Sequence, residues 1–276
     1  MKNDSRFWPL DILPRLYANR LLLWQFTVRN ISARHKGSYL GVFWMVLNPL
    51  LMMSLYSFVF GVIFNGRYDA GDPTETALDY ALGVFLSLTI FQLIAEVMGV
   101  STTIILANTN IVKKVVFPLE ILPVATVGAS IYSFFISLCL VFLGIIVFGR
   151  ELTWMALYLP IIILPVVFFS LGIGWFFSAI GVFVRDIGQL MQFLTLALMY
   201  GSAVFYPIDR AIVAGLYPIL KFNPLAHIVE QARRVVLWQE PLHLEPVLYA
   251  YVTSIAVLLV GYFTFHKLRK GFADVL

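Results

Sequence analysis

The sequence predicts an all-α integral membrane protein with six transmembrane helices, an N-terminal amphipathic interfacial helix and an extracytoplasmic helical hairpin before the last span. Hydrophobic residues make up 61% of the 276 residues, and charged residues only 12%. A soluble domain carries about a quarter charged residues. The apolar residues also fall in runs of about 20, which at 1.5 Å rise per residue cross a hydrocarbon core of roughly 30 Å.

Six apolar runs define the expected spans, at residues 43–64, 80–106, 119–148, 157–184, 190–206 and 247–265. The third and fourth runs exceed one bilayer crossing. Each is either a long, tilted or kinked helix, which we favour, or hides a re-entrant turn near Pro123, Pro160 or Pro165. The chain therefore divides into an N-terminal segment (1–42), a six-helix transmembrane domain (43–266) and a short tail (267–276).

An amphipathic pattern precedes the first span. Arg15 and Arg29 fall on one side of this segment, and the other side carries apolar residues at helical spacing, namely Tyr17, Leu21, Trp24, Val28 and Ile31. The pattern is typical of a helix lying in the membrane interface. A soluble helix packed on a partner protein has the same period and remains the alternative; both interpretations keep the segment cytoplasmic.

The segment 208–246 is too interrupted by prolines and charges to cross a bilayer, so we expect a hairpin at the outer surface. Asn223 followed by Pro224 predicts an N-cap and the first residue of a helix. We expect Glu230 and Arg234 to pair across one turn of this helix. Its other side carries an apolar face formed by Leu225, Ile228, Val229, Ala232 and Val236.

Basic residues indicate the orientation. Thirteen Lys and Arg residues lie in the N-terminal arm, the two loops on the same side and the tail, against six in the opposite loops. The positive-inside rule therefore places both termini in the cytoplasm. Because the net charge of +4 is divided among short segments instead of forming one face, we do not expect nucleic-acid binding.

Motifs for catalysis are missing from the sequence. It contains no GxxxxGK[ST] phosphate loop, no pair of Asp-rich motifs and no HExxH zinc pair, so we expect no catalytic residue, metal site or cofactor on this chain. Glu96 and Glu120 are the acidic residues within the spans. We interpret them as holding helices or loops in register, against Lys113 or Lys114, since each lies closer to the cytoplasmic end of its span.

Several short motifs together resemble polysaccharide-export permeases of the ATP-binding-cassette (ABC) superfamily, a group that includes O-antigen and teichoic-acid exporters. The first is Arg-His-Lys-Gly-Ser-Tyr-Leu-Gly at residues 34–41, followed by Trp44 and by Asn-Pro-Leu at 48–50. The others are Tyr-Ser-Phe-Val-Phe-Gly at 56–61, Asn-Ile-Val-Lys-Lys at 110–114 with Phe-Pro at 117–118, Val-Arg-Asp-Ile at 184–187, Phe-Tyr-Pro at 205–207 and Asn-Pro at 223–224. Together these motifs are distributed over nearly the whole chain.

This resemblance implies a homodimer in the bacterial cytoplasmic (inner) membrane, bound by two separate ABC ATPase subunits that hold ATP and magnesium. The substrate would be a polysaccharide on an undecaprenyl pyrophosphate lipid. The resemblance further implies that the first and fifth spans line an aromatic path, because the apolar face of a sugar ring can stack on aromatic rings. The candidates for this path are Tyr56, Phe60, Tyr200, Phe205 and Tyr206. For any one ring, lipid contact or core packing is the simpler interpretation.

Two further groups of residues follow from the resemblance. The candidates for receiving the lipid pyrophosphate are Arg29, Arg34, His35 and Lys36, with Gly41 allowing a tight turn or a close helix approach. The segment 107–116 would couple to the ATPase, and its candidate residues are Asn108, Asn110, Lys113 and Lys114. The lysines could equally act only as an orientation signal.

Two other functions stay open at this point. A drug or small-lipid exporter of similar topology would need no polymer path, and the motif at 34–41 argues against it. A membrane enzyme of lipid-linked sugar metabolism would work without an ATPase, and the lack of a clustered acidic motif argues against that.

Overall fold

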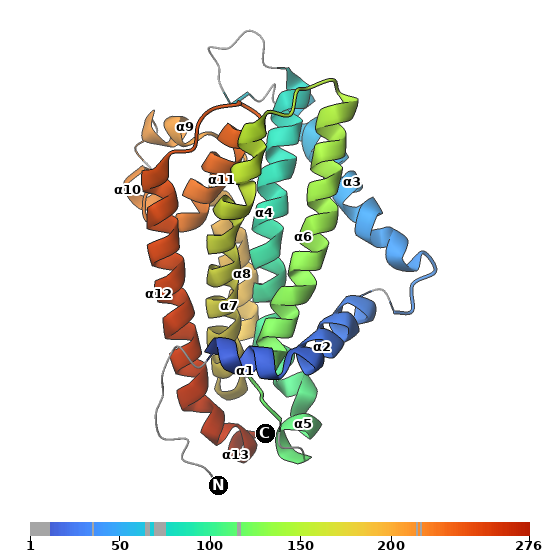
Figure 1. Ribbon diagram of the computed structural model, residues 1–276, viewed down its shortest axis with the longest axis vertical. Coiled ribbons are helices and arrows are strands. Elements are labelled where there is room, and N and C mark those ends of the chain that lie inside the picture. The colour runs from blue at the N-terminus through green and yellow to red at the C-terminus, as the bar shows by residue number, and fades with distance from the viewer. Residues whose placement is uncertain are drawn as a thin grey trace.

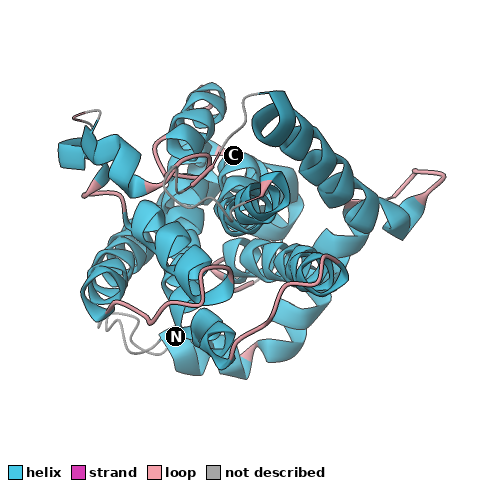
Figure 2. Ribbon diagram, turned by 90° about the horizontal axis from the view of Figure 1, so that it is seen from above, coloured by secondary structure: helices cyan, strands magenta, loops and turns pink. Residues whose placement is uncertain are grey.

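The computed structural model describes residues 12–34, 36–63, 67–68, 76–114, 117–213, 215 and 217–276. This part of the chain is helical and contains no strand (Figure 2). Within these described ranges, four helices are long and apolar enough to cross a membrane. They are α4 (Ala77–Ile104), α6 (Ile121–Val147), α7 (Leu159–Phe183, preceded by the 3-10 turn Trp154–Tyr158) and α12 (Leu244–Leu268), and they run along the long axis of the molecule (Figure 1).

Two shorter apolar helices accompany these four. Helix α3 (Trp44–Tyr56) is continued by a π-helical segment, Ser57–Ile63. Both α3 and α8 (Ile187–Tyr200) pack on α4. The fifth run was predicted to reach residue 206, but α8 ends at Tyr200. Its last turn is followed by a bend in which Ala203 has a φ of 53°, a left-handed conformation that no helix continues.

The third and fourth runs are single helices, as we favoured. Pro123 lies in the first turn of α6, Pro160 lies in the first turn of α7, and Pro165 lies inside α7. Proline is tolerated in a first turn because the N–H groups there have no partner within the helix. No re-entrant turn occurs at these positions.

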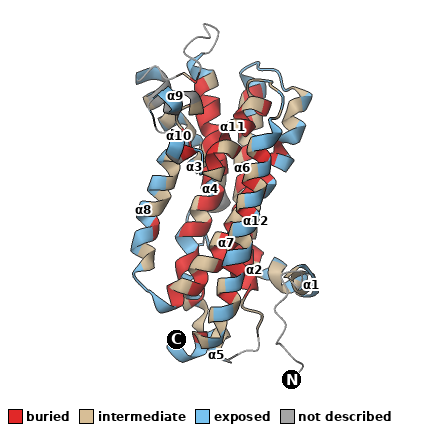
Figure 3. Cartoon of the chain, turned by 90° about the vertical axis from the view of Figure 1, so that its left-hand side faces the viewer, coloured by how far each residue is buried: buried red, intermediate tan, exposed pale blue. Residues whose placement is uncertain are grey.

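The N-terminal helices α1 (Ile12–Ala18) and α2 (Arg20–Ala33) lie across one end of the bundle (Figures 1 and 3). Helix α2 packs on α6. The predicted apolar stripe faces outward, because Tyr17, Leu21, Trp24 and Val28 are exposed and Trp24 retains 67% of its accessible surface. Such an exposed apolar face is expected of a helix that lies on lipid.

The two ends of the bundle carry different elements (Figure 1). At one, the α5 end, lie the 3-10 turn Leu106–Asn108, α5 (Thr109–Lys114) and α13 (Phe272–Val275). At the other, the α11 end, lie α9 (Ile208–Val213), α10 (Tyr217–Leu220) and α11 (Pro224–Val236). The predicted cap of α11 is confirmed, since the Asn223 side chain accepts a hydrogen bond from the backbone N–H of Leu225 at 3.0 Å.

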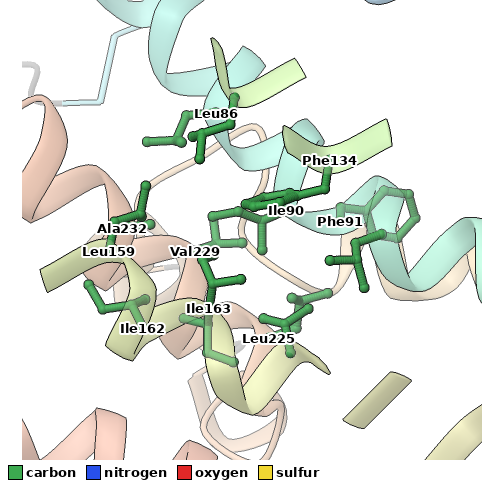
Figure 4. Close-up of a cluster of buried hydrophobic side chains, with 14 of the residues drawn as sticks. Leu86, Ile90, Phe91, Phe134, Leu159, Ile162, Ile163, Leu225, Val229 and Ala232 are labelled. Atoms are coloured by element: carbon green, nitrogen blue, oxygen red, sulfur yellow. The ribbon is translucent and has the colours of Figure 1, made fainter. Parts of the chain in front are cut away.

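The main core joins α11 to three of the long helices. Figure 4 shows Leu86 and Ile90 of α4 and Phe134 of α6 beside Val229 and Ala232 of α11, with residues of α7 completing the cluster. All five predicted face residues of α11 are buried, which confirms that face. Helix α11 is therefore part of the core at its end of the bundle.

Helices α7 and α12 form the closest contact between long helices. A Cβ atom added to Gly261 of α12 would lie 2.0 Å from the carbonyl oxygen of Gly172 in α7, and one added to Gly172 would lie 2.5 Å from the carbonyl oxygen of Val257. The two backbones therefore touch, as small residues allow in membrane helices.

A second apolar cluster gathers at the α5 end. It contains Ile104 at the end of α4 and the following Ile105, Trp175 of α7, Phe265 of α12 and Phe272 of α13. Parts of α1, α2 and α5 pack against it. We call it the basal cluster.

Candidate functional site

A cleft of about 560 Å³ opens between α3, α4 and α6. Each of the three helices lines it with one face. Helix α3 contributes Trp44, Met45, Asn48, Pro49, Met52 and Tyr56; α4 contributes Phe85, Leu88, Thr89, Phe91, Gln92, Leu93 and Glu96; and α6 contributes Ser130, Ser133, Phe134 and Ser137. Arg34, just after α2, and Met199 of α8 complete the lining. We call this space the α3 cleft.

The α3 cleft carries two polar stripes. Thr89, Gln92 and Glu96 follow one another on α4 at intervals of three and four residues, so they share one face of the helix. Ser130, Ser133 and Ser137 repeat the same spacing on α6. From Thr89 to Glu96 the α4 stripe extends about 10 Å along the axis at 1.5 Å per residue.

An ion pair closes the end of the α3 cleft nearest the α5 end. The Arg34 guanidinium lies 2.5 Å from a Glu96 carboxylate oxygen. It also donates hydrogen bonds to the hydroxyls of Ser133 at 2.8 Å and Ser130 at 3.2 Å. The N-terminal segment is thereby tied to both α4 and α6, and each charge in the cleft has a partner of opposite sign.

Farther along the cleft, polar groups lack such partners. Thr89 is 4% exposed, and its hydroxyl has no hydrogen-bond partner among the described residues. Gln92 and Asn48 are exposed at the cleft surface. A buried hydroxyl without a partner is costly and therefore uncommon in native proteins.

Four of the predicted path aromatics meet near the α11 end. The ring centroids of Tyr56 and Phe205 are 5.5 Å apart, and those of Tyr200 and Phe205 are 5.8 Å apart. The Tyr206 hydroxyl donates to the Tyr200 carbonyl at 2.6 Å. The side chain of Phe60 lies outside the described residues. The turn at residues 200–206 thus brings aromatic rings of α3 and α8 together, and we call it the aromatic turn.

A buried arginine of α11 is hydrogen-bonded to the backbone of the aromatic turn. Arg233 of α11 is fully buried and donates hydrogen bonds to the carbonyls of Ala203 at 2.8 Å, Val204 at 3.4 Å and Tyr206 at 3.4 Å. Its charge is met by Glu230, whose carboxylate oxygen lies 2.5 Å from the guanidinium.

Tyr68 completes this arrangement. The Arg233 guanidinium lies 4.3 Å from the centre of its ring, and the Tyr68 hydroxyl donates to the Val204 carbonyl at 3.0 Å. Burial raises the pKa of the Tyr68 phenol above its usual value of 10.0, although Arg233 opposes this shift. The phenol therefore stays protonated and keeps donating to the turn.

At the α5 end, the segment around α5 is tied to both ends of the described chain. The Arg29 guanidinium of α2 donates to the Asn108 side-chain oxygen at 3.0 Å and lies 4.2 Å from the centre of the Phe26 ring. On the other side, Arg269 after α12 lies 3.2 Å from the carboxylate of Glu120, which is buried.

Comparison with known proteins identifies the family. The profile of the ABC-2 type transporter family matches residues 22–237, which is most of the chain. The chain belongs to the ABC-2 type transporter family. It is 27% identical over 257 residues to an O-antigen export system permease protein RfbA of Klebsiella pneumoniae, covering 92% of this chain and 95% of the relative. A protein of the same name from Myxococcus xanthus is 24% identical over 266 residues, covering 96% and 99%.

In this ABC-2 chain, the described members of the four basic residues predicted to receive a pyrophosphate lie in different surroundings. Arg34 points into the α3 cleft, whereas Arg29 contacts Asn108. Lys36 is exposed in the turn after Arg34, and His35 lies outside the described residues. Their predicted role stays a prediction.

Gly41 takes one of its two expected roles. It has a φ of 49°, in the left-handed region that glycine adopts readily, and a Cβ atom there would meet nothing within 4 Å. The glycine therefore serves the turn into α3 and not a close helix approach.

The predicted coupling residues take different positions in this ABC-2 chain. Both polar atoms of the Asn108 side chain form hydrogen bonds. Its oxygen accepts from Arg29, and its nitrogen donates to the Ile104 carbonyl at 2.8 Å. Asn110 and Lys113 are exposed on α5, and the side chain of Lys114 lies outside the described residues. Coupling itself remains a prediction for all four.

Three pairings of charged groups differ from those expected. Glu96 and Glu120 pair with arginines distant in sequence and not with Lys113. Glu230 pairs with Arg233, so the expected pair with Arg234 was wrong; Arg234 lies 2.6 Å from Glu240 instead. Arg233 turns inward because the carbonyls of the aromatic turn lie there. The spacing of Thr89, Gln92 and Glu96 was the available sequence signal for the α3 cleft, and it was overlooked.

Proposed function

We propose that this chain is the membrane subunit of an ATP-driven exporter that moves undecaprenyl-pyrophosphate-linked, O-antigen-like polysaccharide across the bacterial cytoplasmic membrane. The carrying observation is its similarity, over nearly the full length of both chains, to ABC-2 proteins named as O-antigen export permeases. The chain itself transports, and ATP is hydrolysed by a separate subunit.

In this proposal the chain crosses the membrane six times. The four long helices supply four crossings, and α3 with its π-helical continuation and α8 supply the other two. The α5 end is cytoplasmic and the α11 end, with its helical hairpin, is extracytoplasmic, which agrees with the distribution of Lys and Arg. Helices α1 and α2 then lie in the cytoplasmic interface, with Trp24 toward lipid.

The exporter would be a homodimer in which α3 and α8 of each copy face the other. Leu51, Leu55, Phe58 and Val62 are all exposed on α3 and its continuation, at the alternating intervals of four and three residues that suit helix pairing. Helix α8 likewise exposes Phe193, Leu196 and Tyr200. This arrangement would place the aromatic turn beside the path of the polymer, where sugar rings can stack.

The ATPase would dock on α5. Asn110 and Lys113 are exposed there for contact with a partner, while Asn108 is used to hold the segment against α2. A push on α5 would reach α2 through Arg29 and α12 through Glu120 and Arg269. Movement of the two permeases would follow from the difference in contact energy between the two ATPase states.

The lipid pyrophosphate would be received at the cytoplasmic interface, near Lys36 and Arg29. Both side chains are exposed there. Arg34 would contribute only after it leaves Glu96, because its charge is neutralised at 2.5 Å in this structure. Headgroup reception and the state of the α3 cleft would then be linked through one arginine.

Purification and deletion test this proposal. A tagged chain extracted in mild detergent should copurify with a second polypeptide that hydrolyses ATP, and cells lacking the chain should accumulate lipid-linked polysaccharide on the cytoplasmic side. Purification without an ATPase, together with loss of precursor synthesis, would refute the exporter and favour an enzyme of lipid-linked sugar metabolism.

A further inference from the structure

The α3 cleft places hydrogen-bonding groups in the middle of apolar helices. Thr89 and Gln92 lie well inside α4, each with about 18 to 23 Å of helix on either side at 1.5 Å per residue. Polar side chains at such depth in membrane helices face a partner or a polar pathway, because lipid cannot satisfy them. Arg34 already bonds to Glu96, Ser130 and Ser133. The buried hydroxyl of Thr89, which has no partner among the described residues, and the exposed amide of Gln92 therefore remain for an occupant that forms hydrogen bonds.

The charge of the cleft limits what that occupant can be. Its cation, Arg34, is paired with its anion, Glu96, so these two charges cancel. Beyond this pair the lining offers hydroxyls and amides, from Thr89, Ser137, Asn48 and Gln92. Neutral donors and acceptors recognise neutral hydroxyl groups, whereas a phosphate needs uncompensated positive charge.

The apolar lining adds a second requirement. Trp44 and Tyr56 lie on the face of α3 toward the cleft, opposite the two polar stripes. A surface that combines aromatic rings with neutral hydrogen-bonding groups matches a sugar ring, which has apolar C–H faces and a rim of hydroxyls. The volume of about 560 Å³ falls within the range of 300–1,000 Å³ usual for small-ligand pockets.

We propose that the α3 cleft is a binding site for one or two units of uncharged sugar within each chain, which adjoins the polymer path between chains at Tyr56. The ring lies between Trp44 or Tyr56 and the polar stripes, and its hydroxyls bond to Gln92 and to the unpartnered hydroxyl of Thr89. The site rests on the proposed export function and defines its substrate more closely, as a polymer that presents an uncharged sugar.

An acyl or isoprenyl chain is the competing occupant. It would cover the phenylalanine and methionine side chains of the cleft but leave Thr89 and Gln92 without partners. The two occupants respond oppositely to Thr89→Val, which keeps the shape of the side chain and removes its hydroxyl. This substitution should weaken a sugar complex and leave a hydrocarbon complex unchanged or tighter.

Ligand binding to the full-length chain in lipid nanodiscs tests the proposal. Saturation-transfer NMR would be recorded with glucose, galactose, mannose, rhamnose and N-acetylglucosamine, and with inorganic pyrophosphate as the charged probe. We expect saturable binding of at least one sugar, weakened about three- to tenfold by Thr89→Val and more strongly by Gln92→Leu, since each removes hydrogen bonds to a neutral ligand. Ser254→Ala is the matched control, because Ser254 is another buried hydroxyl without a partner among the described residues and lies on α12, outside the cleft lining.

Several results would overturn the sugar site. These are no saturable binding of any sugar, equal binding by wild type and both cleft variants, or pyrophosphate binding that Thr89→Val leaves intact. If the sugar site is refuted but cells without the chain still accumulate lipid-linked precursor, the proposed export function remains supported. Conversely, sugar binding by a chain whose deletion does not affect export would refute the exporter while keeping the site.

Discussion

Replacing Arg233 by methionine tests the arrangement that holds the aromatic turn. The guanidinium is fully buried and donates to three carbonyls of the turn, and it neutralises Glu230, whose side chain is 13% exposed. Removal of one member of a buried ion pair costs about 3–5 kcal/mol, because the remaining charge is left without a partner. We therefore expect Arg233→Met to lower the free energy of unfolding by about 4 kcal/mol.

The neighbouring arginine provides a matched control. Arg234 pairs with Glu240, but their side chains are 25% and 46% exposed, and pairs of this kind contribute about 0–1 kcal/mol. Unfolding in mixed micelles with increasing SDS would measure both variants. The double variant Arg233→Met with Glu230→Met should recover part of the loss, since it leaves no buried charge. Equal losses for Arg233→Met and Arg234→Met, or no recovery in the double variant, would refute the reasoning.

Three further substitutions probe other parts of the molecule. Gly261→Leu should lower stability by about 3 kcal/mol or more in the same SDS titration, because its side chain has no space against the backbone of Gly172. Asn223→Ala should cost about 2–3 kcal/mol, measured in the same way, because it removes the α11 cap and the hydrogen bonds from the Asn223 amide to the Gly201 carbonyl and the Ser202 hydroxyl. Lys113→Glu should reduce the amount of copurified ATPase about tenfold if one favourable charge contact of about 1.4 kcal/mol is lost, whereas Lys221→Glu, at the opposite end, should leave it unchanged.

Each of these expectations has a clear contrary result. Wild-type stability of Gly261→Leu would mean that α7 and α12 are not in backbone contact. An unchanged Asn223→Ala variant would mean that water replaces the cap and the bonds to Gly201 and Ser202 at no cost. Equal ATPase recovery with Lys113→Glu and Lys221→Glu would remove α5 from the docking surface.

Features that depend on neighbours in sequence could be predicted, and those that depend on distant residues could not. The cap at Asn223 and the buried face of α11 follow from local spacing, and both are confirmed. The partner of Glu96 lies 62 residues earlier in the chain, so no local rule selects Arg34 over Lys113. Arg233 and Arg234 are equivalent by residue type, and the carbonyls of the aromatic turn and the Ser87 hydroxyl, which bind the inward-facing Arg233, lie far from it in sequence.

The basal cluster has a consequence for biosynthesis. Phe272 of α13 is fully buried in it, and residues of α5 pack against the same cluster. Helix α5 is made early but gains this support only after α12 and α13 have left the ribosome. A partner that recognises α5 only when it is packed on this cluster would therefore bind fully synthesised chains and not nascent ones. This selectivity would prevent futile ATP hydrolysis during membrane insertion.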